Sequence, residues 1–231
     1  NRAALPELFE QAEPQDQPGK QPRTTFAQDR AGGAADAPKA VEIDAKRAMG
    51  YLELICNLGP RQSGTPGMKR QQEIIRGHFE GLKLTVKDQS FQAKQNSQRN
   101  PVEMTNLIVS IHPDRKRRVI LCSHYDTRPI ADREPDPRKW REKFISANDG
   151  GSGVALLMEL AHHLPQLDAK VGIDLVFFDG EEYIFEPGQD RDRYFFGSEH
   201  FAKTWRASKN RPDYLAGVLF GSMAGVKITH V

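Results

Sequence analysis

The stretch Gly172–Glu182, which reads GIDLVFFDGEE, decides the fold class of this chain. Its first seven residues, Gly172 to Phe178, are the most apolar run in the sequence. A short, nearly continuous apolar run is typical of a strand that is buried on both faces of a sheet. The acidic residues that follow would stand at the carboxyl end of that strand, where α/β proteins place their functional sites. The stretch therefore predicts a central strand with carboxylates at its end.

Helical and extended patterns alternate on both sides of this run. Apolar residues spaced three and four apart predict helices, and short apolar runs between polar turns predict strands. The predicted helices cover residues 48–56, 68–82, 151–167 and 197–205, and the predicted strands cover residues 84–91, 104–111, 119–123, 172–178 and 215–220. This order indicates an α/β protein with three layers, a mixed and mainly parallel sheet with helices on both faces. The strand at 84–91 is expected at an edge.

The chain is predicted to consist of a tail and one domain. Residues 1–40 contain five prolines and four bulky apolar residues. Such a segment cannot bury enough surface to offset the entropy cost of ordering, so we expect a disordered tail. Residues 41–231 are predicted to form a single domain, which suits a chain of 231 residues.

Charge and cysteine content exclude several classes of function. Lys and Arg number 33 against 31 Asp and Glu, a formal charge of +2, so no basic excess indicates a nucleic-acid partner. No run approaches the roughly 18 apolar residues of a membrane span. Cys56 and Cys122 lack the spacing of redox or metal sites and are expected in the core. The chain begins at Asn1, which leaves the compartment open, and we expect export if an upstream leader has been removed.

Three short polar motifs follow or precede the predicted apolar elements. HYD (His124–Asp126) follows the strand at 119–123, NDG (Asn148–Gly150) opens the helix at 151, and DGEE (Asp179–Glu182) ends the strand at 172–178. Because the carboxyl ends of parallel strands meet at one edge of a sheet, we expect these motifs to lie together.

The residue types in these motifs point to metal chemistry. Clustered carboxylates raise one another's pKa unless a cation compensates, so the motifs favour a divalent ion. Mixed imidazole and carboxylate ligands suit zinc better than calcium or magnesium. Successive side chains at a strand end point in different directions. One of Glu181 and Glu182 can therefore bind the ion while the other acts as an acid or base.

Each motif also has a simpler interpretation. The HYD residues could be exposed at a strand end, Asp149 could be only the N-cap of the next helix, and Glu181 and Glu182 could be solvated turn residues. The occurrence of all three motifs in order, at the spacing of an α/β sheet, favours the metal site.

The motifs together resemble a known family. SHYDTRP at 123–129, ANDGGSGVALLMELA at 147–161 and LVFFDGEE at 175–182 are similar to the zinc exopeptidase family, which contains di-zinc aminopeptidases and animal-type glutaminyl-peptide cyclotransferases. The resemblance runs from about residue 59 to the last predicted strand. It implies a zinc exopeptidase-like fold and the N-terminus of a peptide or protein as substrate.

The segment after DGEE resembles the cyclotransferase branch. Fourteen residues, YIFEPGQDRDRYFF, separate Glu182 from Gly197, whereas in typical aminopeptidases only a few residues stand there. The resemblance implies conversion of an N-terminal Gln to pyroglutamate with release of ammonia. Zinc aminopeptidase activity is the alternative.

The resemblance also implies a role for each residue of the motifs. Asp149 and Glu182 would bind zinc, and Glu181 would be the general acid and base. If the chain is an aminopeptidase, two ions are expected, with His124 a ligand of the second and Asp126 orienting that histidine. If it is a cyclotransferase, one ion suffices, and His124 and Asp126 support the site.

The C-terminal sequence departs from the family pattern. The family carries an aspartate just after the last strand, in a pattern like Leu-Asp-Met-Val-Gly, whereas LFGSMAG at 219–225 has no acid. The family's final histidine ligand arrives many residues later, and this chain stops at Val231. We therefore expect a domain that is incomplete at its C-terminus. A third interpretation follows, an inactive or truncated relative that binds a metal or a peptide.

Overall fold

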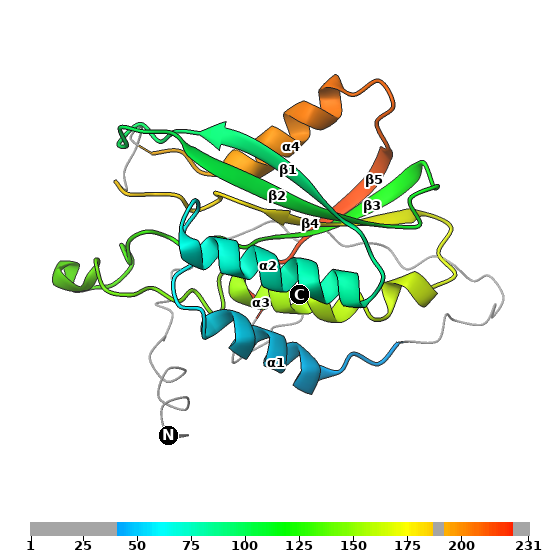
Figure 1. The fold of residues 1–231 in the computed structure, drawn as a ribbon, viewed down its shortest axis with the longest axis horizontal. Helices are drawn as coiled ribbons and strands as arrows, with labels where there is room; N and C mark the ends of the chain where they lie inside the picture. The colour runs from blue at the N-terminus through cyan, green and yellow to red at the C-terminus, as the bar shows by residue number, and fades with distance from the viewer. Residues whose placement is uncertain (1–40, 187–191, 224–231) are drawn as a thin grey trace, which may run out of the picture. The chain divides into compact units, whose positions relative to one another are not determined.

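A five-stranded sheet organises the fold in a computed structural model of the chain, which describes residues 41–186 and 192–223. The predicted tail at 1–40 lies outside the described residues. The strands occur along the sheet in the order β1-β2-β4-β3-β5 (Figure 1). Their bounds are β1 Val86–Ala93, β2 Val102–Ile111, β3 Arg117–His124, β4 Gly172–Phe178 and β5 Asp213–Leu219.

The sheet is mixed, as the sequence predicts. β2 pairs antiparallel with both β1 and β4, whereas β3 pairs parallel with both β4 and β5. It follows that β1, β3, β4 and β5 run in one direction and β2 runs in the other. β1 lies at an edge, as predicted, and β4 is central.

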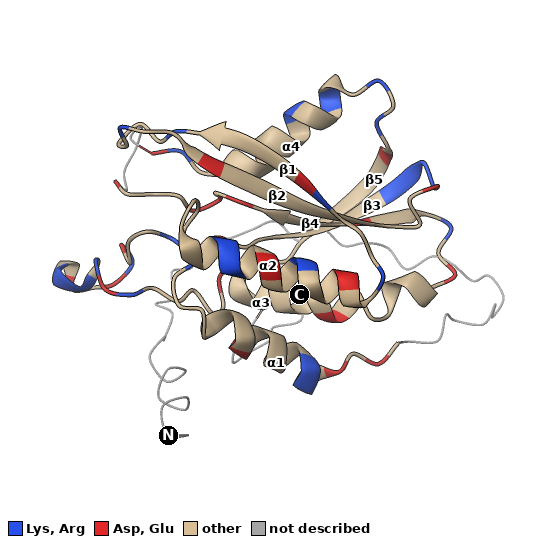
Figure 2. Cartoon of the chain, in the orientation of Figure 1, with Lys and Arg blue, Asp and Glu red and all other residues tan. Residues whose placement is uncertain are grey.

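Helices cover both faces of the sheet. Figure 1 shows α1, α2 and α3 on one side and α4 on the other. Their bounds are α1 Ala45–Cys56, α2 Pro66–Gly81, α3 Gly151–Leu160 and α4 Phe196–Ala207, with short 3-10 helices at Pro137–Lys139 and Leu164–Gln166. α1 and α2 carry both acidic and basic side chains (Figure 2).

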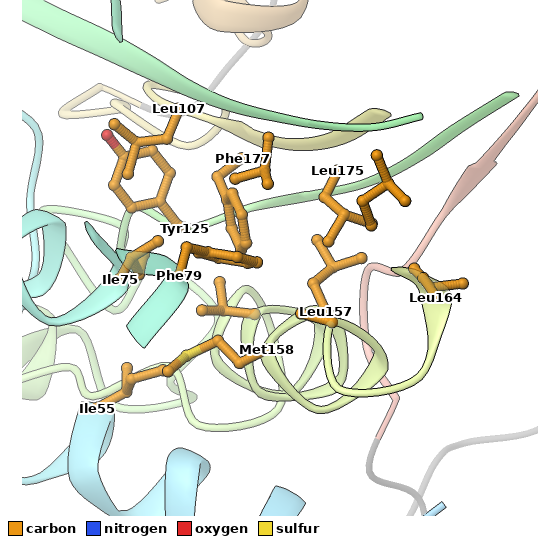
Figure 3. Close-up of a cluster of buried hydrophobic side chains, with 14 of the residues drawn as sticks. Ile55, Ile75, Phe79, Leu107, Tyr125, Leu157, Met158, Leu164, Leu175 and Phe177 are labelled. Carbon is orange, nitrogen blue, oxygen red and sulfur yellow. The ribbon is translucent and has the colours of Figure 1, made fainter. Parts of the chain in front are cut away.

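The strand β4 joins the cores of the two faces. All seven of its residues are buried. Leu175 and Phe177 belong to the large cluster that α1, α2 and α3 complete, as Figure 3 shows. Val176 and Phe178 belong to a second cluster, against which Phe201 of α4 packs. The apolar run at 172–178 is thus buried on both faces, as its composition indicates.

Side-chain caps fix where the first two helices begin. The Asp44 side chain accepts a hydrogen bond from the Arg47 amide at 2.9 Å and caps α1. Thr65 caps α2 in the same way, and Pro66 supplies a suitable φ at its first position. α1 is also tied to α3, because Arg47 donates to the Glu159 carboxylate at 2.6 Å and 2.7 Å.

The predicted helix at 151–167 is too long. α3 ends at Leu160, and a 3-10 helix follows at Leu164–Gln166. Pro165 explains the difference, because proline has no amide hydrogen to donate and its ring clashes with the carbonyl four residues earlier. None of the helices in the described residues has the length and apolar character needed to cross a membrane.

Candidate active site

The three polar motifs meet at one end of the sheet. The last residues of the parallel strands β3 and β4, His124 and Phe178, are direct partners in the ladder. HYD and DGEE therefore begin side by side. NDG lies beside them, because His124 Nε2 is 3.0 Å from Asp149 Oδ1. The structure thus brings together all five residues that the sequence singles out, His124, Asp126, Asp149, Glu181 and Glu182.

Asp126 holds the DGEE turn in place. Its buried carboxylate accepts hydrogen bonds from the backbone amides of Glu181 at 3.1 Å and Glu182 at 2.9 Å. Its Oδ1 is also 3.4 Å from His124 Nδ1, a charge contact and not a hydrogen bond. With both turn amides bound, the two glutamate side chains leave the backbone from fixed positions.

Asp179, the first acid of DGEE, faces the protein interior. It accepts from Ser63 Oγ at 2.6 Å and from the Thr105 amide at 2.9 Å. Burial, with a smaller effect from the Asp126 charge, raises the pKa of Asp179 to about 7. Gly180 follows with φ +68°, a conformation that glycine adopts without strain. Asp179 therefore anchors the turn and does not face the site.

Glu182 is paired with an arginine that the sequence patterns do not assign to the site. Its Oε1 lies 2.5 Å from Arg128 Nη2, and the Glu182 side chain is 11% exposed. Arg128 also binds Asp132 at 2.5 Å and packs over the ring of Tyr194. Burial raises the pKa of Glu182, and the nearby charge of Asp149 adds to this effect. The sequence feature that could have indicated a role for Arg128 in the site is its position inside the motif SHYDTRP.

Glu181 has a freer carboxylate than Glu182. Among the described residues, no side chain donates a hydrogen bond to it. Partial burial raises its pKa, the His124 charge lowers it, and the neighbouring carboxylates of Asp126, Glu182 and Asp149 raise it further. A partly buried carboxylate with a raised pKa is suited to exchanging protons.

The simpler interpretations of HYD and NDG are wrong. His124, Tyr125 and Asp126 are at most 1% exposed, so they are not surface residues at a strand end. The N-cap of α3 is Gly150, at φ +80° and without a side-chain capping bond, so Asp149 does not cap the helix. A Cβ on Gly150 would lie 2.7 Å from the His124 ring, so glycine is needed for the close approach of NDG to HYD.

His124 and Asp149 each shift the pKa of the other in favour of its charged form. Burial alone would lower the pKa of His124, but Asp126 and Asp149 raise it well above its usual value. The same contact lowers the pKa of Asp149. Both carboxylates predicted to bind zinc, Asp149 and Glu182, thus contact a cationic side chain of the chain itself.

The donor set fits a metal only in part. The charge of Asp149 raises the pKa of Glu182, so the two carboxylates lie near each other, and the His124 imidazole lies beside Asp149. Carboxylate and imidazole are ligand types that zinc prefers. However, within residues 41–186 and 192–223 no three His, Cys, Asp or Glu side chains are grouped closely enough to hold an ion. A catalytic zinc usually has three protein ligands, whereas the ligands predicted for a single ion are two, Asp149 and Glu182.

The chain after β5 passes beside Asp149. The Phe220 amide donates to the Cys122 carbonyl at 2.8 Å, Ser222 forms an isolated bridge with Asp149, and the Met223 amide donates to Ser152 Oγ at 2.8 Å. The segment in which the sequence departs from the family pattern therefore lies at the site.

The fold and the site define an α/β protein with an acidic site beyond the carboxyl ends of adjacent parallel strands. The sequence profile of Peptidase family M28 matches residues 106–226. The chain belongs to this family.

Relatives of known structure and name agree with this assignment. A crystal structure of Fimbriiglobus ruber glutaminyl cyclase is 52% identical, with a TM-score of 0.76, over 82% of this chain and 65% of that one. The structure of a leucine aminopeptidase precursor from Bacteroides thetaiotaomicron is 28% identical, with a TM-score of 0.67, over 78% of this chain and 63% of that one. Glutaminyl-peptide cyclotransferase of Drosophila melanogaster is 29% identical over 63% of this chain. The present chain spans 39% of the Drosophila protein's length, and less than two thirds of either solved chain.

Proposed function

We propose that this chain carries the acid–base and metal-binding residues of a zinc-dependent glutaminyl-peptide cyclotransferase. The reaction converts the N-terminal Gln of a peptide to pyroglutamate and releases ammonia. The observation that carries the proposal is the 52% identity to Fimbriiglobus ruber glutaminyl cyclase over 82% of the chain. The site geometry supports it, because Asp126 fixes the backbone of two adjacent glutamates whose carboxylates have different surroundings.

The chemistry divides between these two glutamates. Zinc, when bound, supplies Lewis-acid polarisation of the side-chain amide of the substrate Gln, and Asp149 and Glu182 are the residues that would hold it. The α-amine nitrogen forms a bond to the side-chain amide carbon as the original carbon–nitrogen bond breaks. Glu181 accepts the proton from the amine and returns it to the departing nitrogen, which leaves as ammonia.

The other residues of the site position this pair. Asp126 binds both turn amides, and Asp179 anchors the start of the turn on Ser63 and Thr105. Arg128 contacts the Glu182 carboxylate and would direct it. Arg128 pairs with the second glutamate of DGEE, and within the described residues no ion pair is formed by the carboxylate of the first, which suits it to exchange its proton.

Metal binding and turnover test the proposal together. Zinc titrated into the chain by calorimetry should bind, and binding should be lost in Asp149→Ala and in Glu182→Gln. Glu142→Gln, an exposed glutamate on a loop, is the matched control. Glu181→Gln should keep zinc but lose ammonia release from a Gln-initiated peptide by about 100-fold or more, the usual contribution of a general acid–base. Unchanged zinc binding in both ligand variants would contradict the proposed ligand set.

A second candidate function is peptide or metal binding without catalysis. The observation that favours it is the place of Ser222 beside Asp149, in the segment where the family pattern would put an acid. In that case Glu181→Gln would leave every activity unaltered. Release of free amino acids from peptides with other N-termini would instead indicate the aminopeptidase alternative.

A further inference from the structure

A cavity of about 610 Å³ lies between two loops that flank the site. Residues 130–141 contribute one wall, and Phe185 and Glu186 contribute the other. The apolar part of the lining consists of Ile130, Pro137, Trp140 and Phe185. Neither the acid–base chemistry nor the metal site uses these residues.

The walls of this cavity are held by hydrogen bonds. The Ala131 amide donates to the Trp140 carbonyl at 2.8 Å and closes the first loop. Trp140 Nε1 donates to the Glu134 carbonyl at 2.8 Å, which fixes the orientation of the indole. In the second loop, the Phe185 amide donates to Asp192 Oδ2 at 2.8 Å, and the rings of Tyr183 and Phe185 meet edge to face. Two aromatic side chains of the lining are therefore held in place before any ligand binds.

The cavity lies near the proposed active site. The two loops start from Arg128 and Glu182, whose side chains are joined by the 2.5 Å ion pair. Ile130 is two residues beyond Arg128, and Phe185 is three beyond Glu182. With 3.8 Å between consecutive Cα atoms, these wall residues lie within about 8 Å and about 12 Å of the ion-paired residues. An extended peptide advances roughly 3.3 Å per residue, so the second to fourth residues of a bound peptide can reach the cavity.

The charges at the cavity complement an apolar side chain better than a basic one. The charged residues of the lining are Arg138, Arg141 and Glu186. Asp136 binds Arg138 at 2.8 Å and holds it on the loop. The named charges therefore balance, and a lysine or arginine side chain would lose hydration against the apolar wall without gaining an unpaired carboxylate that the cavity is shown to offer.

We infer that this cavity is a subsite for a large apolar side chain, preferably aromatic, at position 2, 3 or 4 of the peptide substrate. This inference rests on the proposed function, which places the peptide N-terminus at Glu181 and Glu182. Burial of the side chain against Trp140 and Phe185 would give the enzyme a preference for peptides by sequence beyond the first residue.

The experiment uses Trp140 as its own reporter. The chain has two tryptophans, so Trp205→Phe leaves Trp140 as the single source of indole fluorescence. The probes are Gln-Ala-Ala-Ala amide and three versions with Phe at position 2, 3 or 4, titrated into the zinc-loaded protein. At least one Phe peptide should bind roughly tenfold tighter than the alanine peptide, with a change in Trp140 emission. A Lys in place of that Phe should remove the gain.

Variants of the wall separate this subsite from the rest of the site. Trp140→Ala, measured by calorimetry, should lose the gain for the Phe peptide while its Kd for the alanine peptide stays unchanged. Phe185→Leu is the second variant, in case Trp140→Ala disturbs the loop. Lys139→Ala, on the same loop but outside the cavity lining, is the matched control and should keep the gain.

The outcomes distinguish this inference from the proposed function. If the alanine peptide binds and is cyclised but Phe gives no gain, or Trp140→Ala and Phe185→Leu both keep it, the subsite is wrong and the function stands. If Phe peptides bind through Trp140 and are not cyclised, the cavity is supported and the cyclotransferase proposal is overturned. If no probe binds, both are overturned.

Discussion

The strands β4 and β5 are alike in length and pairing but differ in burial. Each has seven residues, and each pairs parallel with β3, one on either side. All residues of β4 are buried, whereas every residue of β5 except the half-buried Tyr214 is exposed. Leu215, Val218 and Leu219 are 45%, 47% and 57% exposed. The difference in burial follows the position in the sheet. β4 lies between β3 and β2, whereas β5 has β3 on one side and no described strand on the other.

The same difference divides the candidate site. The DGEE turn follows β4. Its amides donate to Asp126, and its own Asp179 accepts from Ser63 and Thr105, so the turn is bonded to three other segments of the chain. The β5 side brings Ser222 to Asp149 through an isolated bridge that follows an exposed strand. The two glutamates of the proposed site thus follow a well-packed strand, whereas the segment beside Asp149 follows a poorly covered one.

Truncating one apolar side chain in each strand is expected to give the largest contrast. Leu175→Ala removes a side chain with no exposed surface and should lower the free energy of unfolding by about 2–5 kcal/mol. Val218→Ala in β5 should change it by less than about 0.5 kcal/mol, because this side chain is 47% exposed. Urea denaturation of both variants measures the difference. Equal costs would show that β5 is covered in solution.

Acid should weaken the helical layer that covers β4. The Glu159 side chain has no exposed surface and, although burial opposes ionisation, its bonds to Arg47 and His163 lower its pKa to about 2. A depressed pKa means that this stabilisation is complete above about pH 4.5, the ordinary value, and is lost as the pH falls towards 2. The loss should be about 1–3 kcal/mol.

Glu159→Gln isolates that contribution. The variant should be less stable than the wild type at pH 7, and the gap should close between pH 4.5 and pH 2 in denaturant titrations. Glu80→Gln, an exposed glutamate on α2, is the control and should follow the wild-type curve. A gap that stays constant with pH would show that the ionised carboxylate is not the source.

The well-covered parts of the fold were the predictable ones. The run at 172–178 identifies a central strand because every residue packs against a neighbour that the pattern anticipates. The end of α3 was misplaced because helical periodicity continues past Leu160, and only the backbone limits of Pro165 stop the helix. For β5 the sequence predicts a strand, but its exposure depends on which elements lie beside it, and no local pattern carries that information.

The site shows the same division. His124, Asp126, Asp149, Glu181 and Glu182 were found because strand ends bring the motifs together. The ion pair of Arg128 with Glu182 was missed, since it joins residues 54 apart and no spacing rule links them. The bonds of Asp126 to the turn amides were also missed. Every residue except proline has a backbone amide, so the residue types in the turn do not indicate which carboxylate binds them.

A smaller effect should come from the polar contact that links β5 to β4. Tyr214 on β5 donates to Asp174 on β4 at 2.6 Å, and Arg118 on β3 binds the same carboxylate. Tyr214→Phe removes the hydroxyl and should cost about 1 kcal/mol in urea denaturation. Asp213→Asn, at the exposed start of the same strand, is the control and should have no measurable effect. If Tyr214→Phe costs as much as Leu175→Ala, then β5 is an integral part of the core.

The smallest effect on stability should come from Leu219→Lys, although it should change association. Leu219 is 57% exposed on β5, which is an edge strand among the described strands. A lysine there loses little burial, and the free energy of unfolding should stay within about 0.5 kcal/mol of the wild type. An apolar edge strand can pair with another chain, and a charge on it opposes such pairing. Sedimentation velocity over a range of concentrations should therefore show less self-association in Leu219→Lys than in the wild type. Leu175→Lys would instead unfold the domain, because β4 has no free edge or face on which to place a charge.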